Sequence, residues 1–342
     1  MMNSFFKAVR GFLLEYLPKQ KCCSANTVRS YRQSLNLFVA YLQKEGQFKL
    51  EQIDFEIIDR PLLLNFLEYL EEQRHCSVSS RNQRLMALRS FFKYAGMSDC
   101  VQAALYLTVS DIPIKKDAGK TVEFLSEEAL STLLNQPDTL RRAGMRNLFF
   151  MILLYDTAAR CGELLNLKVR DLRLDGQHPM AYLTGKGNKV RTVPLMKKTV
   201  AHCEKYLRKF HGCSENRLDE YVFYTTIHNE RKPMSADTVA TFMKSYGETA
   251  KTICPNIPDR VHPHLLRHTR AMHFYRNGMP LALLSELLGH ADPETTKIYA
   301  YADTEMKRAA MEKADAKRTY NQESAPIWEN DEELILKLSG LK

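Results

Sequence analysis

The sequence has no long run of apolar residues. The longest run, residues 148–155, is far shorter than the roughly 20 residues that a helix needs to cross a bilayer. Internal repeats and low-complexity tracts are also absent, and 44% of the residues are hydrophobic. These features exclude a polytopic membrane protein, a collagen-like chain and wholesale disorder. A chain of 342 residues is long enough for about two domains.

Cysteine pairs with the spacing of metal or redox sites are missing as well. The eight cysteines are scattered and none forms a C-x-x-C pair, which excludes a zinc knuckle and a thioredoxin-type couple. The opening segment, residues 1–20, has no small-residue cleavage site, and its apolar residues recur at helical spacing among Lys7, Arg10 and Glu15. We therefore predict a folded helix there instead of an export signal, and a cytoplasmic protein.

Negative charge is scarcer than positive charge. Lys and Arg number 49 against 40 for Asp and Glu, which gives a formal net charge of +9. Such a balance favours a polyanionic partner, either a nucleic acid or an anionic membrane surface.

The first hundred residues show helical periodicity. Ser24 and Asp59 are predicted N-caps of two helices, and Ser79 or Ser80 is predicted to open a third. With the opening helix, these segments predict a four-helix unit.

Two of these helices carry polar faces with few carboxylates. Hydroxyl, amide and guanidinium groups suit a phosphate backbone and the edge of a DNA groove, although an ordinary solvated face has the same composition. The candidate DNA-binding residues are Thr27, Arg29 and Arg32 on one helix, and Ser80, Arg81, Arg84, Arg89 and Lys93 on another.

The helical pattern lapses over residues 109–123, which contain Pro, Gly and three lysines. We predict a helical domain over residues 1–110, a linker over 111–123, a second domain over 124–320 and a tail over 321–342. The second domain should hold a helix capped by Ser126, a long buried helix over 146–167 and a hairpin of strands 181–184 and 190–195, and be mainly helical after residue 201. In the tail, Asp331 is expected to cap a short helix. The predicted fold class is mainly α with a small antiparallel β-sheet (α+β).

Polar residues interrupt several segments that otherwise resemble core. They are Arg160 with Glu163, His264 with Arg267, His290 with Tyr299 nine residues later, and Lys186 at the predicted hairpin tip. Each has an ordinary structural explanation: an intrahelical ion pair, a packed aromatic ring or a well-formed turn. His264 and His268 lie one helical turn apart, but Leu265 stands where a zinc protease needs Glu, so we expect no zinc site there.

The order and spacing of these residues, Arg…Lys…His-x-x-Arg…His…Tyr, resemble the tyrosine recombinases, the phage integrase and Xer family. The segments that carry the resemblance are TAARCG, TGKGNKVRTVPL, HPHLLRH and LGHADPETTKIY. It extends over residues 5–318. Ala158 and Cys161 depart from the family pattern, which often has Gly before the arginine box and a branched residue after it.

The resemblance implies a helical core-binding (SAM-like) domain followed by a tyrosine recombinase catalytic domain. It implies that Tyr299 attacks a DNA phosphodiester to form a 3′-phosphotyrosyl link, without metal, ATP or any other cofactor. His264 would then accept the proton of Tyr299, and Lys186 would protonate the leaving oxygen. The further roles implied are phosphate clamps for Arg160 and Arg267, a hydrogen bond to phosphate or support of the nucleophile for His290, and orientation of Arg160 by Glu163. Tyr301 is a rival nucleophile that the spacing disfavours.

The same resemblance implies the partners. They are double-stranded DNA carrying a specific core site, a homotetramer on two such sites, and in some systems an accessory directionality factor, with no membrane. The tail helix would dock on a neighbouring protomer or on its own domain. No arm-binding module is expected before the helical domain. Integration or excision of a mobile element is the favoured activity, and resolution of chromosome or plasmid dimers, a type IB topoisomerase and a DNA-binding protein with a decayed site are the alternatives.

Overall fold

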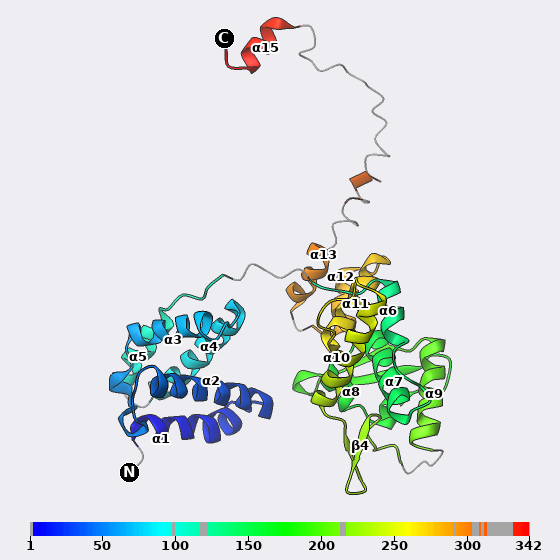
Figure 1. The fold of residues 1–342 in the computed structure, drawn as a ribbon, viewed down its shortest axis with the longest axis horizontal. Helices are drawn as coiled ribbons and strands as arrows, with labels where there is room; N and C mark the ends of the chain where they lie inside the picture. Colours follow the sequence, from blue (N-terminus) through cyan, green and yellow to red (C-terminus); the bar gives the residue numbers. More distant parts are fainter. Residues whose placement is uncertain are drawn as a thin grey trace. The chain divides into compact units, whose positions relative to one another are not determined.

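The computed structural model describes residues 3–97, 100–116, 122–212, 217–290, 292–302, 308, 311–312 and 331–341. The chain forms two compact units, Met1–Lys120 and Thr121–Lys342 (Figure 1). Each unit has its own hydrophobic core.

The first unit is entirely helical in its described part. Its helices are α1 (Ser4–Gly11), a π-helical segment (Phe12–Gln20), α2 (Ala25–Lys44), two 3-10 turns (Leu50–Gln52 and Phe55–Ile57), α3 (Arg60–Glu72), α4 (Val78–Ala95) and α5 (Cys100–Ser110). The N-caps predicted at Ser24 and Asp59 are confirmed, because each side chain accepts a backbone N–H of its own helix. The third predicted helix begins earlier, because Ser77 is the cap of α4.

Helix α5 is an addition to the four helices that the sequence predicted. Its segment, CVQAALYLTVS, is apolar nearly all round, so no single stripe reveals the helical period. The helix contacts α4, and Val109 is fully buried in the core of the unit. This core is rich in aromatic rings that meet edge to face, such as Phe5 with Phe91 and Phe38 with Phe66.

The second unit combines helices with two small sheets. Its helices are α6 (Glu127–Leu134), α7 (Arg142–Thr157), α8 (Cys161–Leu165), α9 (Lys197–Phe210), α10 (Ala236–Ile253), α11 (Pro263–Arg276), α12 (Leu281–Leu288) and α13 (Lys297–Ala302), with 3-10 turns at Val169–Asp171, Lys186–Asn188 and Pro293–Thr296. Its strands are β1 (Leu172–Arg173), β2 (Met180–Thr184), β3 (Val190–Pro194), β4 (Tyr224–Ile227) and β5 (Glu230–Pro233). The cap predicted at Ser126 is confirmed.

The predicted hairpin is confirmed as β2 and β3, and β1 adds a third antiparallel strand beside β2. The segment after residue 201 is mainly helical, as predicted, and the second hairpin, β4–β5, is an addition to it. Its turn residues His228 and Asn229 have positive φ values of 49° and 63°. Asn adopts this conformation readily, but without a glycine the turn was weakly marked in the sequence.

The prediction of one long helix over residues 146–167 is wrong. Helix α7 ends at Thr157, Ala158 adopts the left-handed conformation (φ 48°, ψ 32°), and α8 starts at Cys161. Alanine favours helix, so the residues themselves carry no sign of the break. A tertiary contact stabilises it instead, because the buried Arg267 donates a hydrogen bond of 2.6 Å to the carbonyl of Ala158.

In the tail, helix α15 (Glu332–Leu338) forms with Asp331 as its cap, as predicted. No residue of α15 is buried. In the part of the chain that is described, no helix has the combination of length and apolar character required to cross a membrane.

Candidate active site

The break between α7 and α8 sets the position of Arg160, which is the N-cap residue of α8. Its backbone N–H donates to Glu163 Oε2 (2.7 Å), and its Nη1 donates to Glu163 Oε1 (2.9 Å). Glu163 is only 4% exposed at its side chain. The predicted pair is therefore a short clamp in which the buried Glu163 holds the backbone N–H and Nη1 of Arg160, and Nη2 remains for a second acceptor.

Arg191 on β3 completes this clamp, and sequence reasoning missed it. Its Nη1 and Nη2 donate to the two oxygens of Glu163 at 2.8 and 2.7 Å, and its side chain is 14% exposed. The signal was present in the alternation of β3, because Arg191 and Val193 share the inward face of the strand. An arginine on the buried face of a strand requires a partner, and Glu163 is that partner.

Three consecutive carbonyl groups at the end of α12 hold the cations together. Arg191 Nε donates to Leu287 O (2.9 Å), Arg267 Nη2 to Leu288 O (2.7 Å) and Arg160 Nη2 to Gly289 O (3.1 Å). The C-terminal end of a helix carries partial negative charge, which offsets the repulsion among the guanidinium groups. Gly289 has φ 62°, and a Cβ there would lie 3.1 Å from Arg191 Cδ, so both backbone and space favour glycine.

The surroundings of these side chains shift their proton affinities. Burial, followed by the charges of Arg160 and Arg191, lowers the pKa of Arg267 to about 10, so the guanidinium remains charged at neutral pH. Burial alone would raise the pKa of Glu163, but hydrogen bonds from Arg191 and Arg160 bring it below its usual value. Burial also raises the pKa of the Cys161 thiol to about 11, which makes it a poor nucleophile.

Tyr299 on α13 is fully buried, with 0% of its surface exposed. Its ring lies in a small apolar cluster with Ala158, residues of α11 and residues of α12. Its hydroxyl lies 2.9 Å from Nδ1 of His268, so the hydrogen-bond partner is His268 and not His264. Burial raises the pKa of Tyr299 to about 12, although Arg267 opposes this shift.

The histidines of the site are neutral at pH 7. Burial, and then nearby positive charge, lowers the pKa values of His268 and His290 to about 4, and it lowers that of His264 as well. His290 Nδ1 lies 2.8 Å from the hydroxyl of Thr296, in the turn that precedes α13. A neutral His268 can therefore accept the hydrogen bond of the Tyr299 hydroxyl.

The structure thus brings together most of the predicted site. Arg160, Glu163, Arg267, His290 and Tyr299 surround the end of α12, and His264 lies one turn from His268 on α11. For Lys186 the backbone is described, in the turn between β2 and β3, whereas its side chain lies outside the described part.

The candidate DNA-binding residues divide into two groups. Helices α2 and α4 lie side by side, and Thr27, Ser30 and Gln83 line one hollow between them. In the first group of candidates, Arg29, Arg32 and Lys93 are exposed on these helices. Arg81 and Arg89 differ: Arg81 is buried and donates to the carbonyl of Pro113, and Arg89 donates to the carbonyls of Val109, Ser110 and Ile112. These two side chains stabilise the unit itself, which corrects their placement on an open face.

Comparison with known proteins also divides the chain into two parts. Residues 123–306 match the phage integrase family, and residues 12–97 match the N-terminal SAM-like domain of phage integrases. The predicted fold class, a helical SAM-like domain followed by a catalytic domain with small antiparallel sheets, is confirmed.

Relatives of similar length extend over most of the chain. The protein y4rC of Sinorhizobium fredii, named as an integrase/recombinase, is 32% identical over 306 residues, or 89% of this chain and 90% of the relative. The tyrosine recombinase XerC of Bacillus pumilus is 30% identical over 301 residues, or 86% of this chain and 92% of the relative. The crystal structure of the XerH recombinase bound to a palindromic difH substrate, a post-cleavage complex, has the same fold (TM-score 0.65, 21% identity, 92% and 90% of the two chains). Together with the family match over more than half of the sequence, these relatives establish that the chain belongs to the phage integrase family of tyrosine-type, site-specific DNA recombinases.

Proposed function

We propose that this recombinase cuts one strand of its target by attack of Tyr299 on a DNA phosphodiester, leaving a 3′-phosphotyrosyl link and a free 5′-hydroxyl. The observation that carries the proposal is the convergence of Arg160, Arg267 and Tyr299 around the end of α12. Two permanently charged guanidinium groups can hold the non-bridging oxygens, where negative charge accumulates in the transition state. They supply the positive charge for which other phosphoryl-transfer sites use metal ions.

The buried tyrosine needs help to lose its proton. With a pKa of about 12, Tyr299 is fully protonated at neutral pH. His268 accepts its hydrogen bond in this structure, and we therefore assign proton acceptance to the pair of His268 and His264 on α11. His290 supports the turn before α13 through Thr296, and Lys186 on the β2–β3 turn is assigned to protonate the leaving 5′-oxygen.

Within this proposal the first unit, with residues 1–110 as its core-binding domain, holds one side of the duplex through α2 and α4. Its proposed contacts remain Thr27, Arg29, Arg32, Ser80, Arg84 and Lys93, since none of these residues is buried. Residues 124–320 form the catalytic domain, and residues 111–123 join the two.

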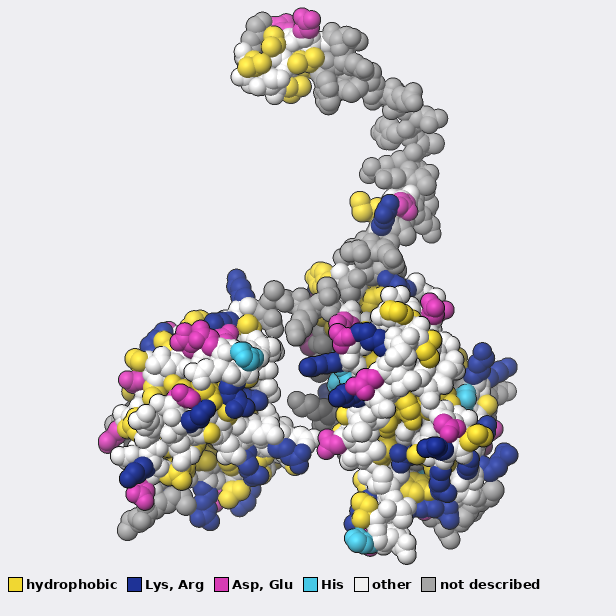
Figure 2. Space-filling view, viewed as in Figure 1, with side chains coloured by type: hydrophobic (Ala, Val, Ile, Leu, Met, Phe, Trp, Pro, Cys, Tyr) yellow, Lys and Arg dark blue, Asp and Glu magenta, His cyan; other side chains and the backbone are white. Residues whose placement is uncertain are grey.

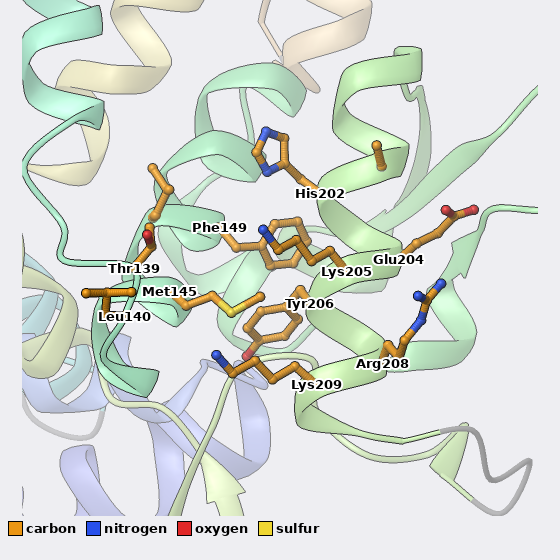
Figure 3. A pocket seen from close by; sticks show the side chains of 12 residues that line it. Thr139, Leu140, Met145, Phe149, His202, Glu204, Lys205, Tyr206, Arg208 and Lys209 are labelled. Carbon is orange, nitrogen blue, oxygen red and sulfur yellow. The ribbon is translucent and has the colours of Figure 1, made fainter.

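The biological reaction that we propose is integration or excision of a mobile element by a cytoplasmic homotetramer on two core sites, with or without a directionality factor. Resolution of chromosome or plasmid dimers is the alternative, and the XerC and XerD relatives support it. In the tetramer, α15 would dock on a neighbouring protomer. The hollow of about 810 Å³ between α7 and α9 is a suitable acceptor, because Lys205 and Lys209 extend across it toward Met145 (Figure 3) and complement the acidic first turn of α15.

A nicked-duplex assay tests the chemistry. Duplexes that carry candidate core sites from the DNA flanking the gene, each with a nick beside the expected cleavage position, are incubated with the protein without metal. An adduct that resists SDS and maps to Tyr299 is expected, and Tyr299→Phe should abolish it while DNA binding persists. Tyr301→Phe is the matched control, since Tyr301 is 72% exposed on the same helix. An adduct on Tyr301, or adducts on unrelated DNA with relaxation of supercoiled plasmid, would contradict the proposal.

A further inference from the structure

The segment by which the chain enters the second unit, residues 122–125, is attached to side chains of α11. The backbone N–H of Leu125 donates to Thr269 Oγ1 (3.0 Å), and its carbonyl accepts from Nε2 of His273 (3.0 Å). Thr269 and His273 are four residues apart, so they lie on one face of the helix. Leu125 is itself fully buried. Both backbone groups of this buried residue are therefore held by a single face of α11.

The adjoining face of α11 belongs to the active site. His268, which precedes Thr269 in the sequence, lies with Nδ1 2.9 Å from the hydroxyl of Tyr299. Arg267 donates to carbonyl groups at the ends of α7 and α12. One helix thus joins the entry of the chain into the second unit to the nucleophile and to the phosphate clamp.

Side chains of the same segment also pack on the apolar cluster that buries the nucleophile. This tyrosine cluster consists of Ala158, Ala271, Met272, Leu284, Leu288 and Tyr299. Val122 and Phe124 are partly buried against it, and the guanidinium of Arg276 lies over the ring of Phe124 (4.7 Å to the centroid). The tyrosine cluster is much smaller than the main core of the unit, so each partner supplies a large share of its contacts.

The chain that leads to this segment is anchored on the first unit as well. Asn82 of α4 donates to the carbonyl of Lys115 (2.8 Å) and accepts its backbone N–H (3.2 Å). Lys115 Nζ also pairs with Glu71 of α3 (2.6 Å). From residue 116 to residue 122 the chain can span at most about 20 Å. A short tether therefore connects an anchor on α4 with the tyrosine cluster.

We infer that residues 122–125 form a positioning segment that keeps Tyr299 covered until duplex DNA engages both units. The inference rests on the proposed function and adds to it the route by which binding exposes the nucleophile. When both units bind one duplex, the short tether displaces Phe124 from the tyrosine cluster, and the contacts that cover Tyr299 weaken. The free energy for this change comes from DNA contacts that both units make only in the displaced state. Phe124 acts through the cluster and is a positioning residue.

Acylation of tyrosines in the DNA-free protein tests the role of Phe124. The native chain and Phe124→Ala are treated with N-acetylimidazole, and the modified peptides are quantified by mass spectrometry. Loss of the ring should speed modification of Tyr299 on the order of 10-fold, because local opening becomes more frequent. Tyr301, which is 72% exposed, should react equally in both chains, and Tyr206, which is 1% exposed in the main core, should stay protected.

Two further variants separate a specific role from a loss of packing. Phe124→Leu keeps an apolar side chain against the tyrosine cluster and should restore most of the protection of Tyr299. Tyr246→Ala removes a partly buried ring that packs on the main core, and it should leave Tyr299 protected. The comparison of these two variants with Phe124→Ala shows whether the effect depends on the place of the ring.

A longer tether tests the connection to DNA. A flexible Gly/Ser insertion of about six residues after residue 119 should slow adduct formation on nicked duplex on the order of 10-fold at saturating protein, because the tether no longer displaces Phe124. Phe124→Ala in the same chain should restore the rate, since its ring no longer covers the nucleophile. The same insertion after Gly176, in the exposed turn between β1 and β2, is the control and should leave the rate unchanged.

Other outcomes would overturn the inference. Protection of Tyr299 that survives Phe124→Ala, or equal acceleration at Tyr206 and Tyr299, would show that Phe124 has no specific role in covering the nucleophile. A tether insertion that leaves the rate unchanged would exclude the tether as the route from DNA. Absence of an adduct in every chain would instead refute the Tyr299 chemistry. Acylation is read without DNA and would still decide the role of Phe124, so the two failures are distinguishable.

Discussion

At the scale of single residues, the site depends on a carboxylate that does not touch the substrate in our proposal. Glu163 receives four hydrogen bonds, two from Arg160 and two from Arg191. Arg191 also joins β3, the strand after the Lys186 turn, to the end of α12. It thereby connects the segments that carry the proposed acid, the phosphate clamp and His290.

Arg191→Leu should therefore weaken both stability and cleavage. Loss of charged hydrogen bonds to a buried carboxylate should lower the free energy of unfolding by about 2 kcal/mol. Misplacement of Arg160 should slow single-turnover cleavage on the order of 100-fold. Denaturant unfolding and quenched cleavage assays measure the two effects, and Arg173→Leu, on an exposed position of β1, is the control. A cycle with Glu163→Gln that shows no coupling would refute this account.

The lowered pKa of His268 predicts a pH effect on stability. Its pKa is about 4 in the folded chain and close to 6.5 in an unfolded one, so the unfolded state binds more protons between these values. The stabilisation is fully present above pH 6.5 and is lost as the pH falls toward 4. The melting temperature should therefore drop over this window, and His268→Gln should reduce the drop. His202→Gln, on the exposed face of α9, should leave it unchanged, and equal curves for both variants would rule out His268 as the source.

At the scale of elements, the decisive feature is the interrupted helix between residues 142 and 165. Caps, the β2–β3 hairpin and most helices were predictable, because they depend on local preferences such as Ser24 at an N-cap or Gly187 with φ 74° in a turn. Three features were not predictable: the break at Ala158, the ion pair of Arg191 with Glu163, and the hydrogen bond between Tyr299 and His268. Each depends on a contact between segments distant in the sequence, which periodicity does not encode.

The left-handed conformation explains why the family often has glycine where this chain has Ala158. A non-glycine residue in this region costs roughly 1–2 kcal/mol, and glycine would relieve it. Removal of a buried methyl group costs about 0.8 kcal/mol, and the greater freedom of unfolded glycine about 0.5–1 kcal/mol. Ala158→Gly should therefore be nearly neutral, whereas Ala159→Gly, also at a buried position, should lose about 1.5 kcal/mol. Chemical denaturation measures both, and equal losses would argue against strain at Ala158.

At the scale of the whole molecule, the main features are the positive charge and the tail helix α15, none of whose residues is buried. Figure 2 shows Lys and Arg side chains spread over both units, in agreement with the net charge of +9. The sequence predicted this character and the order of the domains. It could not show that the start of α7 lies beside the β4–β5 hairpin, because the two segments are separated by some eighty residues and meet only in the fold.

The tail predicts a difference between binding and assembly. Leu338 is 67% exposed, and a helix as short as α15 is marginal in water unless it docks. Leu338→Asp should leave binding to a single core site intact but reduce assembly on two sites, which gel mobility and light scattering measure separately. Lys337→Gln, which changes the charge of the same helix by the same one unit at an exposed position, is the control. Assembly that survives Leu338→Asp would show that the tail docks on its own domain or has no role in it.

The complete burial of Tyr299 has a consequence for the enzyme when no DNA is bound. A phenol with no solvent contact and a hydroxyl already engaged with His268 cannot reach a passing phosphodiester. In our proposal, opening α13 is therefore a separate step, and contacts with the correct DNA would meet its free-energy cost. On the proposed mechanism, an enzyme without its target keeps Tyr299 buried, and only the target DNA would expose the nucleophile.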